Sequence, residues 1–156
     1  MEPSRNPDEY RPCVGVVLQN DQGLIFIGER TDAPGAWQMP QGGIDKGESV
    51  PAAALRELGE EIGTQKAEIE RLTTDWHYYD FPADIREKAS KGKWLGQRQH
   101  WALARFTGTD QDIDLTADDH QEFSQWRWAT PDDVIALIVG FKRPVYEAVL
   151  AELLAR

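Results

Sequence analysis

The sequence predicts an α/β fold, a sandwich in which helices cover both faces of a mixed sheet. Short apolar runs rich in β-branched residues, typical of strands, recur along the chain. One helix-like segment lies in the middle, and two more follow the last strand. We expect residues 1–156 to form a single domain, because this length is usual for one domain and no repeat, linker or low-complexity tract interrupts it.

The composition is that of a folded protein with a strong negative charge. The formal net charge is −10, and 40% of the residues are hydrophobic. This charge disfavours tracking along a nucleic acid backbone, but it does not exclude gripping one phosphorylated end. Cys13 is the only cysteine, so neither an intramolecular disulfide nor a thiolate metal cluster is possible. Without a signal-peptide pattern or an apolar run of about 20 residues, we expect a cytoplasmic monomer with no membrane segment.

The first third of the chain is expected to hold a hairpin and a short strand. A loose lead-in over residues 1–9 is followed by two apolar runs, 13–19 and 24–27. Between them stands the turn signal Asn20-Asp21-Gln22-Gly23. Residues 37–39 form a short strand that Pro40 ends. Cys13 is expected to be a small buried core residue.

The central helix has clear start and stop signals. Ser49 can cap it, Pro51 falls in the first turn, and Gly63 is a suitable end. An apolar stripe at i, i+3 and i+7 gives the helix a face for the core, formed by Leu55, Leu58 and Ile62.

The second half alternates strands and loops and ends in two helices. Thr130-Pro131-Asp132-Asp133 is a helix start, with Thr130 as the cap. The tryptophans at 126 and 128 alternate with Arg127, as in a strand with one buried face. The expected elements are a strand over 67–79, a long loop or hairpin tip over 85–96, a strand over 97–106, an acidic loop over 110–119, a strand over 125–129, and helices over 131–138 and 143–154.

The central helix carries an acidic face made by Glu57, Glu60 and Glu61. Like charges three or four residues apart destabilise a helix by roughly 0.2–0.5 kcal/mol per pair. A bound divalent cation would remove this penalty, and carboxylates without His or Cys suit hard ions such as Mg²⁺ or Mn²⁺. Taken alone, the same pattern is also typical of a solvated helix face.

The loop before the helix favours the metal site over the solvated face, because its glycines permit a sharp turn into the helix. Loop and helix together resemble the Nudix box: Gly, five residues, Glu, seven residues, then Arg-Glu-apolar-x-Glu-Glu-x-Gly-apolar. Thr64 departs from the pattern, at a position expected to pack rather than react. The matching positions are Gly42, Glu48, Arg56, Glu57, Leu58, Glu60, Glu61 and Gly63.

Further stretches resemble one branch of the Nudix hydrolases, the bacterial RNA pyrophosphohydrolases and the related dinucleoside polyphosphate hydrolases. They are Tyr10-Arg11-Pro12, residues 37–43 (Trp-Gln-Met-Pro-Gln-Gly-Gly), Gly96-Gln97-Arg98-Gln99, Glu122-Phe123 with residues 126–128 (Trp-Arg-Trp), and Phe141-Lys142-Arg143 with Val145-Tyr146. The resemblance implies the Nudix fold and removal of pyrophosphate from the 5′-triphosphate end of RNA. Cleavage of diadenosine tetraphosphate remains open. A module that binds without cleaving would be expected to lose box acids, and this chain keeps them.

The resemblance also implies roles for individual residues. Glu57, Glu60, Glu61 and Glu122 hold Mg²⁺ or Mn²⁺, more than one ion, and one Glu that the family leaves open takes a proton from water. Arg56 and Glu48 brace the loop and helix. Lys142 and Arg30 neutralise phosphates, Arg11 and Phe141 enclose a base, and Tyr79 is a weaker candidate for the same pocket.

Each of these positions also has a plain structural reading. Glu122 is equally a loop acid, Lys142 a surface lysine and Phe141 a core aromatic. Gln97 and Gln99 alternate outward on a strand and either line the site or reflect strand polarity. The three histidines, His77, His100 and His120, lack ligand spacing and are interpreted as structural or surface residues.

Overall fold

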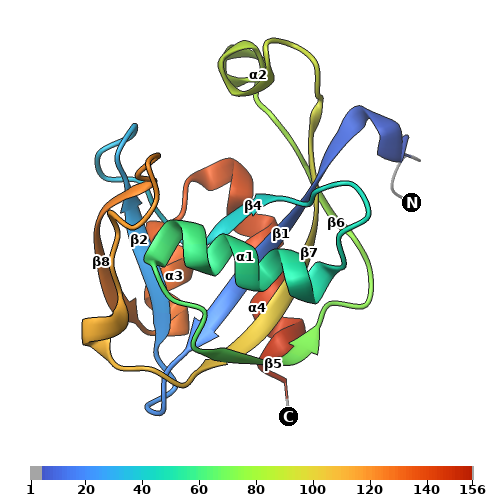
Figure 1. The fold of residues 1–156 in the computed structure, drawn as a ribbon. Helices are drawn as coiled ribbons and strands as arrows, with labels where there is room; N and C mark the ends of the chain where they lie inside the picture. Colours follow the sequence, from blue (N-terminus) through green and yellow to red (C-terminus); the bar gives the residue numbers. More distant parts are fainter. Residues whose placement is uncertain (1–4, 156) are drawn as a thin grey trace.

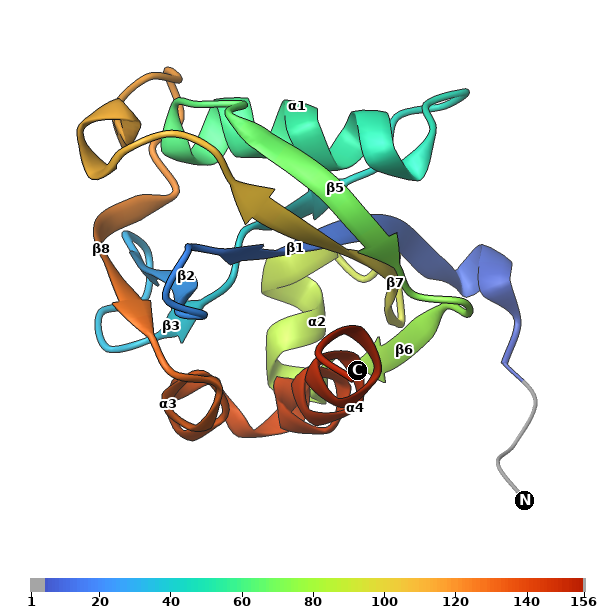
Figure 2. The same cartoon turned by 90° about the horizontal axis from the view of Figure 1, so that it is seen from below.

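The computed structural model describes residues 5–155, without the side chains of Ala89 and Ser90, and shows a mixed sheet between two helical layers (Figure 1). Seen from below, α1 covers one face of the sheet and α3 and α4 cover the other (Figure 2). The predicted α/β/α sandwich is therefore confirmed. The strands are β1 (Tyr10–Gln19), β2 (Ile25–Arg30), β3 (Trp37–Gln38), β4 (Gln41–Gly43), β5 (Ala67–Leu72), β6 (His77–Asp80), β7 (Gly96–Phe106) and β8 (Phe123–Ala129). The helices are α1 (Val50–Ile62), α2 (Ala83–Ser90), α3 (Pro131–Leu137) and α4 (Arg143–Leu153), with 3₁₀ turns at Pro7–Glu9, Asp110–Asp112 and Gly140–Lys142.

Strands β1 and β7 form the centre of the sheet and run parallel, in register from Tyr10 with Gly96 to Gln19 with Arg105. The other strand pairs are antiparallel. Strand β1 is covered on both faces, which explains why its sequence is a continuous apolar run rather than an alternating one. Its side chains nevertheless alternate between the layers: Val14, Val16 and Leu18 pack in the α1 core and Val17 in the α3–α4 core.

Helix α1 begins and ends where the sequence predicts. The Ser49 hydroxyl accepts a hydrogen bond from the Ala52 N–H (3.2 Å), and Gly63 closes the helix with a left-handed φ of 78°. Leu58 and Ile62 are buried against the sheet, and Leu55 is half-buried at its edge. The local signals and the packing therefore specify the same helix.

The opposite layer also follows the sequence. The Thr130 hydroxyl accepts a hydrogen bond from the Asp133 N–H (3.2 Å) and caps α3. In α4, the predicted stripe Val145, Val149 and Leu153 is buried. No helix among residues 5–155 is long and apolar enough to cross a membrane.

Strand β8 confirms the predicted alternation of its aromatic residues. Trp126 stacks on Phe26 with ring centroids 5.4 Å apart, and Trp128 meets the same ring edge-on at 6.2 Å. Arg127 points to the other face, where its guanidinium lies 5.4 Å from the Trp37 ring centroid. The sheet thus has tryptophans in its α1 core and a charge on its far side.

Three strand predictions need correction. The hairpin of β1 and β2 exists, but the two strands pair only at Gln19 and Ile25. Otherwise β1 pairs with β4, and β2 pairs with β8. The predicted strand over 67–79 is two strands, β5 and β6, both paired with β7. The glycine loop contains a further strand, β4, which pairs with β1. Of the predicted lead-in, residues 1–4 lie outside the described part.

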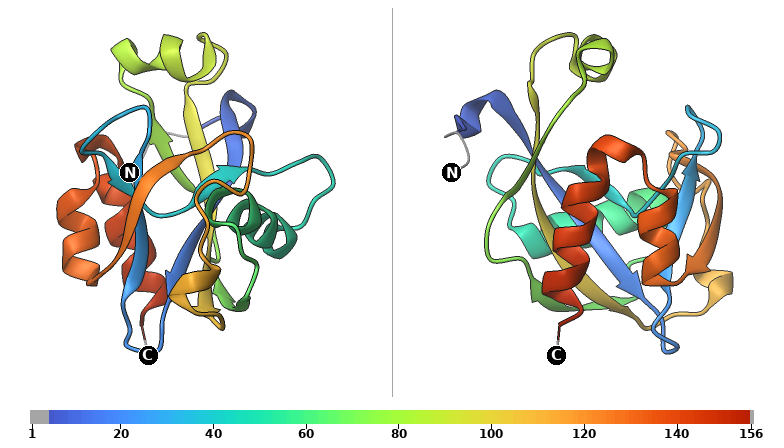
Figure 3. Two further views of the ribbon diagram at one scale, coloured as in Figure 1. Left: turned by 60° about the vertical axis from the view of Figure 1, so that its left-hand side comes forward. Right: turned by 180° about the vertical axis from the view of Figure 1, so that it is seen from behind.

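The segment predicted as a loop or hairpin tip is a tip that contains a helix. Strands β6 and β7 pair antiparallel, as a hairpin requires, and α2 lies between them. Helix α2 lacks an apolar stripe, and Pro82 at its start makes no side-chain capping bond. Both signals that revealed α1 are therefore weak here. Figure 3 shows α2 projecting beyond the end of the sheet.

Candidate active site

A cavity of about 600 Å³ lies where α1, the β4 loop, β6, α2 and the segments before β8 and α4 meet. Nine of the ten candidate residues line it, and only Arg56 stands behind its wall. The nine are Arg11, Arg30, Glu57, Glu60, Glu61, Tyr79, Glu122, Phe141 and Lys142. Segments far apart in the sequence thus place these side chains around one space.

The carboxylates of α1 are not equally exposed. Glu57 and Glu61 are buried, with 7% and 4% of their surface exposed, whereas Glu60 is exposed. Burial raises the pKa of Glu57 against the opposing pull of Arg56. Burial, reinforced by Glu57 and then Glu122, raises the pKa of Glu61 well above its usual range. This face of α1 is therefore an acidic wall in which two of the three carboxylates are buried rather than solvated.

Gly42 makes room for the first of these carboxylates. A Cβ atom built at Gly42 would lie 2.1 Å from the carboxylate carbon of Glu57. Strand β4, which carries Gly42, is fixed by pairing with β1. Any side chain at this position would therefore displace the Glu57 carboxylate.

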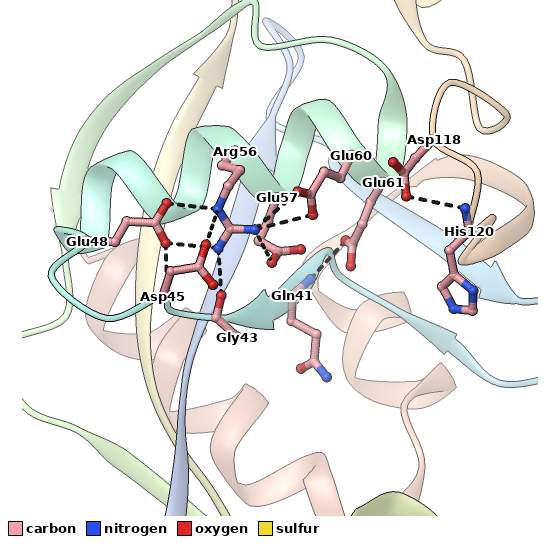
Figure 4. A network of polar contacts seen from close by, with 10 residues as sticks. All are labelled: Gln41, Gly43, Asp45, Glu48, Arg56, Glu57, Glu60, Glu61, Asp118 and His120. Atoms are coloured by element: carbon pink, nitrogen blue, oxygen red, sulfur yellow. Dashed lines mark hydrogen bonds and ion pairs between the residues drawn. The ribbon is translucent and has the colours of Figure 1, made fainter.

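Arg56 connects the loop to the helix through six hydrogen bonds (Figure 4). It donates to both Glu48 oxygens (2.8 and 2.9 Å), the Gly43 carbonyl (2.7 Å), Glu57 (2.9 Å) and both Glu60 oxygens (3.3 Å each). The Arg56 guanidinium lowers the pKa of Glu48 to about 2. Arg56 thus orients the carboxylates of Glu57 and Glu60 and does not itself line the cavity.

Glu61 and Glu122 close the acidic wall from two sides. The Glu61 carboxylate accepts a hydrogen bond from the Gln41 N–H (3.1 Å). Glu122 lies 3.2 Å from the His120 ring nitrogen, and its charge contributes to the raised pKa of Glu61. Glu122 therefore faces α1, and His120, interpreted from sequence as a structural or surface residue, lines the cavity beside it.

The donor chemistry of this wall suits a hard divalent cation, because it offers carboxylates and no sulfur. Among residues 5–155, no three His, Cys, Asp or Glu side chains are gathered in a cluster that could hold a metal ion. Glu57 and Glu60 turn toward Arg56, and Glu122 toward His120. Because these carboxylates line one cavity, they are the residues that could hold a metal ion.

Lys142 and Arg30 bring positive charge to the cavity lining. Lys142 is 5% exposed, and its ammonium lies 3.4 Å from the Gln38 side-chain oxygen. Burial, with a contribution from the charge of Arg30, lowers the pKa of Lys142 to about 8. Arg30 donates two hydrogen bonds to Asp32, at 2.9 and 2.6 Å. Lys142 is therefore not the surface lysine that the plain structural reading allows.

The far end of the cavity is aromatic. Phe141 is half-buried, packs against the α3–α4 core and lies 5.7 Å from the Tyr79 ring. The Lys142 ammonium is 5.8 Å from each of the two rings. Arg11 is exposed at the rim next to Gly43. Phe141 thus combines both readings from the sequence: it lines the cavity and it packs on the core.

A chain of glutamines runs from the core to the cavity wall. The Trp101 indole N–H donates to the Gln99 amide oxygen (3.0 Å). The Gln99 amide nitrogen in turn donates to the side-chain oxygens of Gln97 (2.8 Å) and Gln41 (3.1 Å). Gln99 is 1% exposed, so the prediction that it points outward is wrong, while Gln97 lines the cavity. Burial raises the pKa of Tyr79, and a hydrogen bond from the Gln41 side chain opposes this.

Sequence reasoning missed several residues that line the cavity. Those on the α2 side were hidden because their segment has no periodic pattern. Gln38 and Gln41 lay inside a stretch recognised only as a motif, with no role for its polar side chains. The missed lining residues are Asp32, Gln38, Gln41, Phe81, Ile85, Lys88, Trp94, Asp118 and His120, together with the backbone of Gly42 and Gly43.

Comparisons with known proteins extend over most of the chain. A model of the NUDIX domain matches residues 9–149. The RNA pyrophosphohydrolase of Roseobacter denitrificans is 55% identical over 144 residues, which cover 90% of this chain and 89% of that protein. The RNA pyrophosphohydrolase of Wolbachia pipientis subsp. Culex pipiens is 49% identical over 144 residues, which cover 92% of this chain and 89% of that protein.

The solved structures share the fold at much lower identity. A C. elegans Ap4A hydrolase in a binary complex matches with a TM-score of 0.63 at 20% identity, covering 91% of this chain and 98% of that one. At this identity the likeness shows the fold and no more.

Proposed function

The chain belongs to the NUDIX family of hydrolases, and from this premise we propose that it removes pyrophosphate from the 5′-triphosphate end of RNA to leave a 5′-monophosphate. The observation that carries the proposal is the cavity itself, whose lining combines buried carboxylates, aromatic rings and, beside those rings, the buried cation Lys142. A nucleotide has the matching sequence of groups, because its phosphate chain leads to a base.

The carboxylates of Glu57, Glu60, Glu61 and Glu122 are proposed to hold the divalent ions that Nudix hydrolases generally use, here Mg²⁺ or Mn²⁺ and more than one ion. When bound, such ions draw charge from the phosphate chain and make water a better nucleophile near neutral pH. One of the four carboxylates accepts the proton of the attacking water. Arg56 keeps Glu57 and Glu60 oriented through the bonds described above.

The remaining residues bind and orient the substrate. Lys142 is a compact cation suited to phosphate oxygens, and Arg30 adds a second positive charge on the same side. Phe141, with Tyr79 behind it, offers a ring for a base, and Arg11 offers a guanidinium plane at the rim. Because stacking surfaces accept any base, we expect weak sequence preference at the stacked position.

The setting of the activity follows the same proposal. We place it in a cytoplasmic, monomeric protein whose single domain spans residues 1–156. With a net charge of −10, the surface as a whole repels a polyanion, so the substrate is held at its end and not along its length. A duplex 5′ end would keep its first base paired and unavailable for stacking.

The test is the cleavage rate of matched triphosphorylated RNAs with zero to four unpaired 5′ nucleotides, at two salt concentrations, beside diadenosine tetraphosphate. We expect cleavage to require unpaired nucleotides and to fall only gently with salt, since few phosphates are contacted. Efficient cleavage of a blunt duplex end, or a steep salt dependence, would refute end gripping. Cleavage of the dinucleotide without cleavage of any RNA would replace RNA as the substrate.

A further inference from the structure

The hairpin tip between β6 and β7, residues 82–95, forms an arm that projects beyond the end of the sheet (Figure 3) and contributes to the cavity lining. The arm is closed at its base, where the Phe81 N–H donates to the Leu95 carbonyl (2.8 Å). The Leu95 N–H in turn donates to the Glu9 carbonyl (2.9 Å). Helix α2 ends at Lys91, whose left-handed φ of 54° lets its N–H bond the Glu87 carbonyl (2.8 Å). Hydrogen bonds thus fix the base of the arm and the end of its helix.

One side of the arm faces the cavity. Ile85 and Lys88 are three residues apart and share a face of α2, and both line the cavity together with Trp94. Ile85 and Trp94 also pack against the α3–α4 core, which holds this side of the arm in place. The arm therefore adds a ring and a cation that the Nudix box and the family-like residues do not account for.

Trp94 stands where the cavity meets a second hollow of about 570 Å³. Arg11, Gly43 and Glu57 line both spaces as Trp94 does, and the second hollow continues over Ile44 and Lys46. A substrate whose chain continues past the first nucleotides therefore has a route out of the cavity that passes Trp94.

The charge of the arm differs in sign from that of the whole protein. Residues 83–94 contain four basic side chains, Arg86, Lys88, Lys91 and Lys93, and two acidic ones, Asp84 and Glu87, in a chain of net charge −10. The Lys93 ammonium lies 5.0 Å from the Trp94 ring centroid. A ring with cations around it is the combination that binds single-stranded nucleic acid without reading its sequence.

We propose that the arm binds the RNA chain beyond the nucleotide whose base the cavity holds, with Trp94 stacking on a later base and Lys88 meeting a backbone phosphate. This inference rests on the proposed function, because it assigns a route to the RNA whose 5′ end the cavity holds. It makes Trp94 and Lys88 sensitive to substrate length, because a substrate too short to reach the arm has nothing for them to bind.

The test compares a triphosphorylated dinucleotide with a triphosphorylated pentanucleotide of the same 5′ sequence. The measured quantity is the ratio of kcat/KM for the longer substrate to that for the shorter one. Trp94→Leu should lower this ratio about tenfold, chiefly through KM, since one stacked base contributes on the order of 1–3 kcal/mol. Trp94→Phe keeps a ring and should restore most of the ratio. Lys88→Gln should lower it by a smaller factor.

Lys66→Gln is the matched control for charge, because Lys66 is an exposed lysine that pairs with Asp112 and lies outside the cavity. It should leave the ratio unchanged. Melting temperatures near that of the wild type identify variants that remain folded, and Lys88→Gln, on an exposed side chain, keeps the test open if Trp94→Leu does not fold.

Wild-type cleavage of the pentanucleotide is measured first. Its absence overturns the proposed function, and this inference with it. If the wild type cleaves both RNAs but the ratio is unaltered in Trp94→Leu and Lys88→Gln, the arm does not lie on the path of the RNA, and this inference alone fails. Equal losses on both substrates, with the ratio preserved, also overturn it and assign Trp94 to shaping the cavity.

Discussion

The two ends of the cavity are built in opposite ways. Apart from Glu122, the acidic end comes from one stretch, residues 42–63, in which hydrogen bonds from Arg56 hold Glu57 and Glu60. The aromatic end gathers Tyr79, Trp94 and Phe141 from three distant segments, and packing against a shared core holds it. The difference teaches that the chemical end is specified locally and the recognition end by the tertiary fold. Changes at the acidic end should affect every substrate, and changes at the aromatic end should affect only substrates that reach it.

Burial acts on both ends and with opposite sign on acids and bases. It raises the pKa of Glu57 and Glu61 and lowers that of Lys142, because in each case it disfavours the charged form. An anionic substrate with its cations would supply countercharges to these groups. The site therefore carries an electrostatic cost that binding relieves.

The largest effect is expected for Glu57→Gln, which keeps the shape of the side chain and removes the charge that attracts the metal. Metal ions supply several kcal/mol of charge stabilisation, so activity should fall on the order of a thousandfold on RNA and dinucleotide alike. Excess chelator should abolish turnover of the wild type. Turnover of Glu57→Gln at the wild-type rate would remove Glu57 from the metal-holding set.

The same variant should be more stable without metal. The pKa of Glu57 is raised by folding, so its contribution to stability is greatest below about pH 4.3 and is lost as the pH rises through the raised value. Glutamine does not ionise, so the melting temperature of Glu57→Gln in chelator should exceed that of the wild type at pH 7. The gap should close toward pH 4, and a gap that does not depend on pH would contradict the charge explanation.

Arg56→Lys tests the brace behind the acidic end. Lysine keeps one charge but cannot make the six directed bonds of Arg56, and supporting residues of this kind typically contribute about 10–100-fold in activity. The loss should be the same for both substrates and should fall partly on metal affinity. A titration of activity with Mn²⁺ measures this, and an unchanged midpoint would show that the brace does not act on the metal.

Phe141→Ala tests the aromatic end of the cavity. Loss of a stacked ring should weaken binding by about 1–3 kcal/mol for a substrate with a base in the pocket. Inorganic triphosphate has no base and should be hydrolysed as by the wild type. Since Phe141 also packs on the core, its melting temperature is measured alongside. Equal losses with and without a base would assign Phe141 to the core alone and end the contrast between the two ends.

The smallest effect is expected from pH acting on Lys142. With a pKa of about 8, this side chain loses its proton as the pH rises from 7 to 9, where about one-tenth remains charged. The KM for RNA should therefore rise several-fold over this range. Arginine stays charged, so Lys142→Arg should have a flatter profile. Parallel profiles for the two proteins would show that another group titrates.

The acidic end was predictable because the sequence of α1 carries clear start and stop signals. Ser49, Pro51 and Gly63 mark its bounds, and the spacing of Glu57, Glu60 and Glu61 marks its chemistry. The burial of two of these acids was not predictable, since it depends on Gly42 in a strand that no pattern revealed. The hairpin tip was predicted, but its helix α2 was not, because α2 owes its place to packing of Ile85 and Trp94 and not to its own periodicity.

The glutamine chain has a direction, and the core sets it. An indole N–H can only donate, so the oxygen of the Gln99 amide must face Trp101 and its nitrogen must face the cavity. The oxygens of Gln97 and Gln41 then face Gln99, which turns both of their NH₂ groups away from it. A side chain that never meets solvent thereby fixes which atoms two glutamines offer at the cavity wall. At these two side chains the wall therefore presents amide hydrogens, the polarity that suits a ligand rich in oxygen.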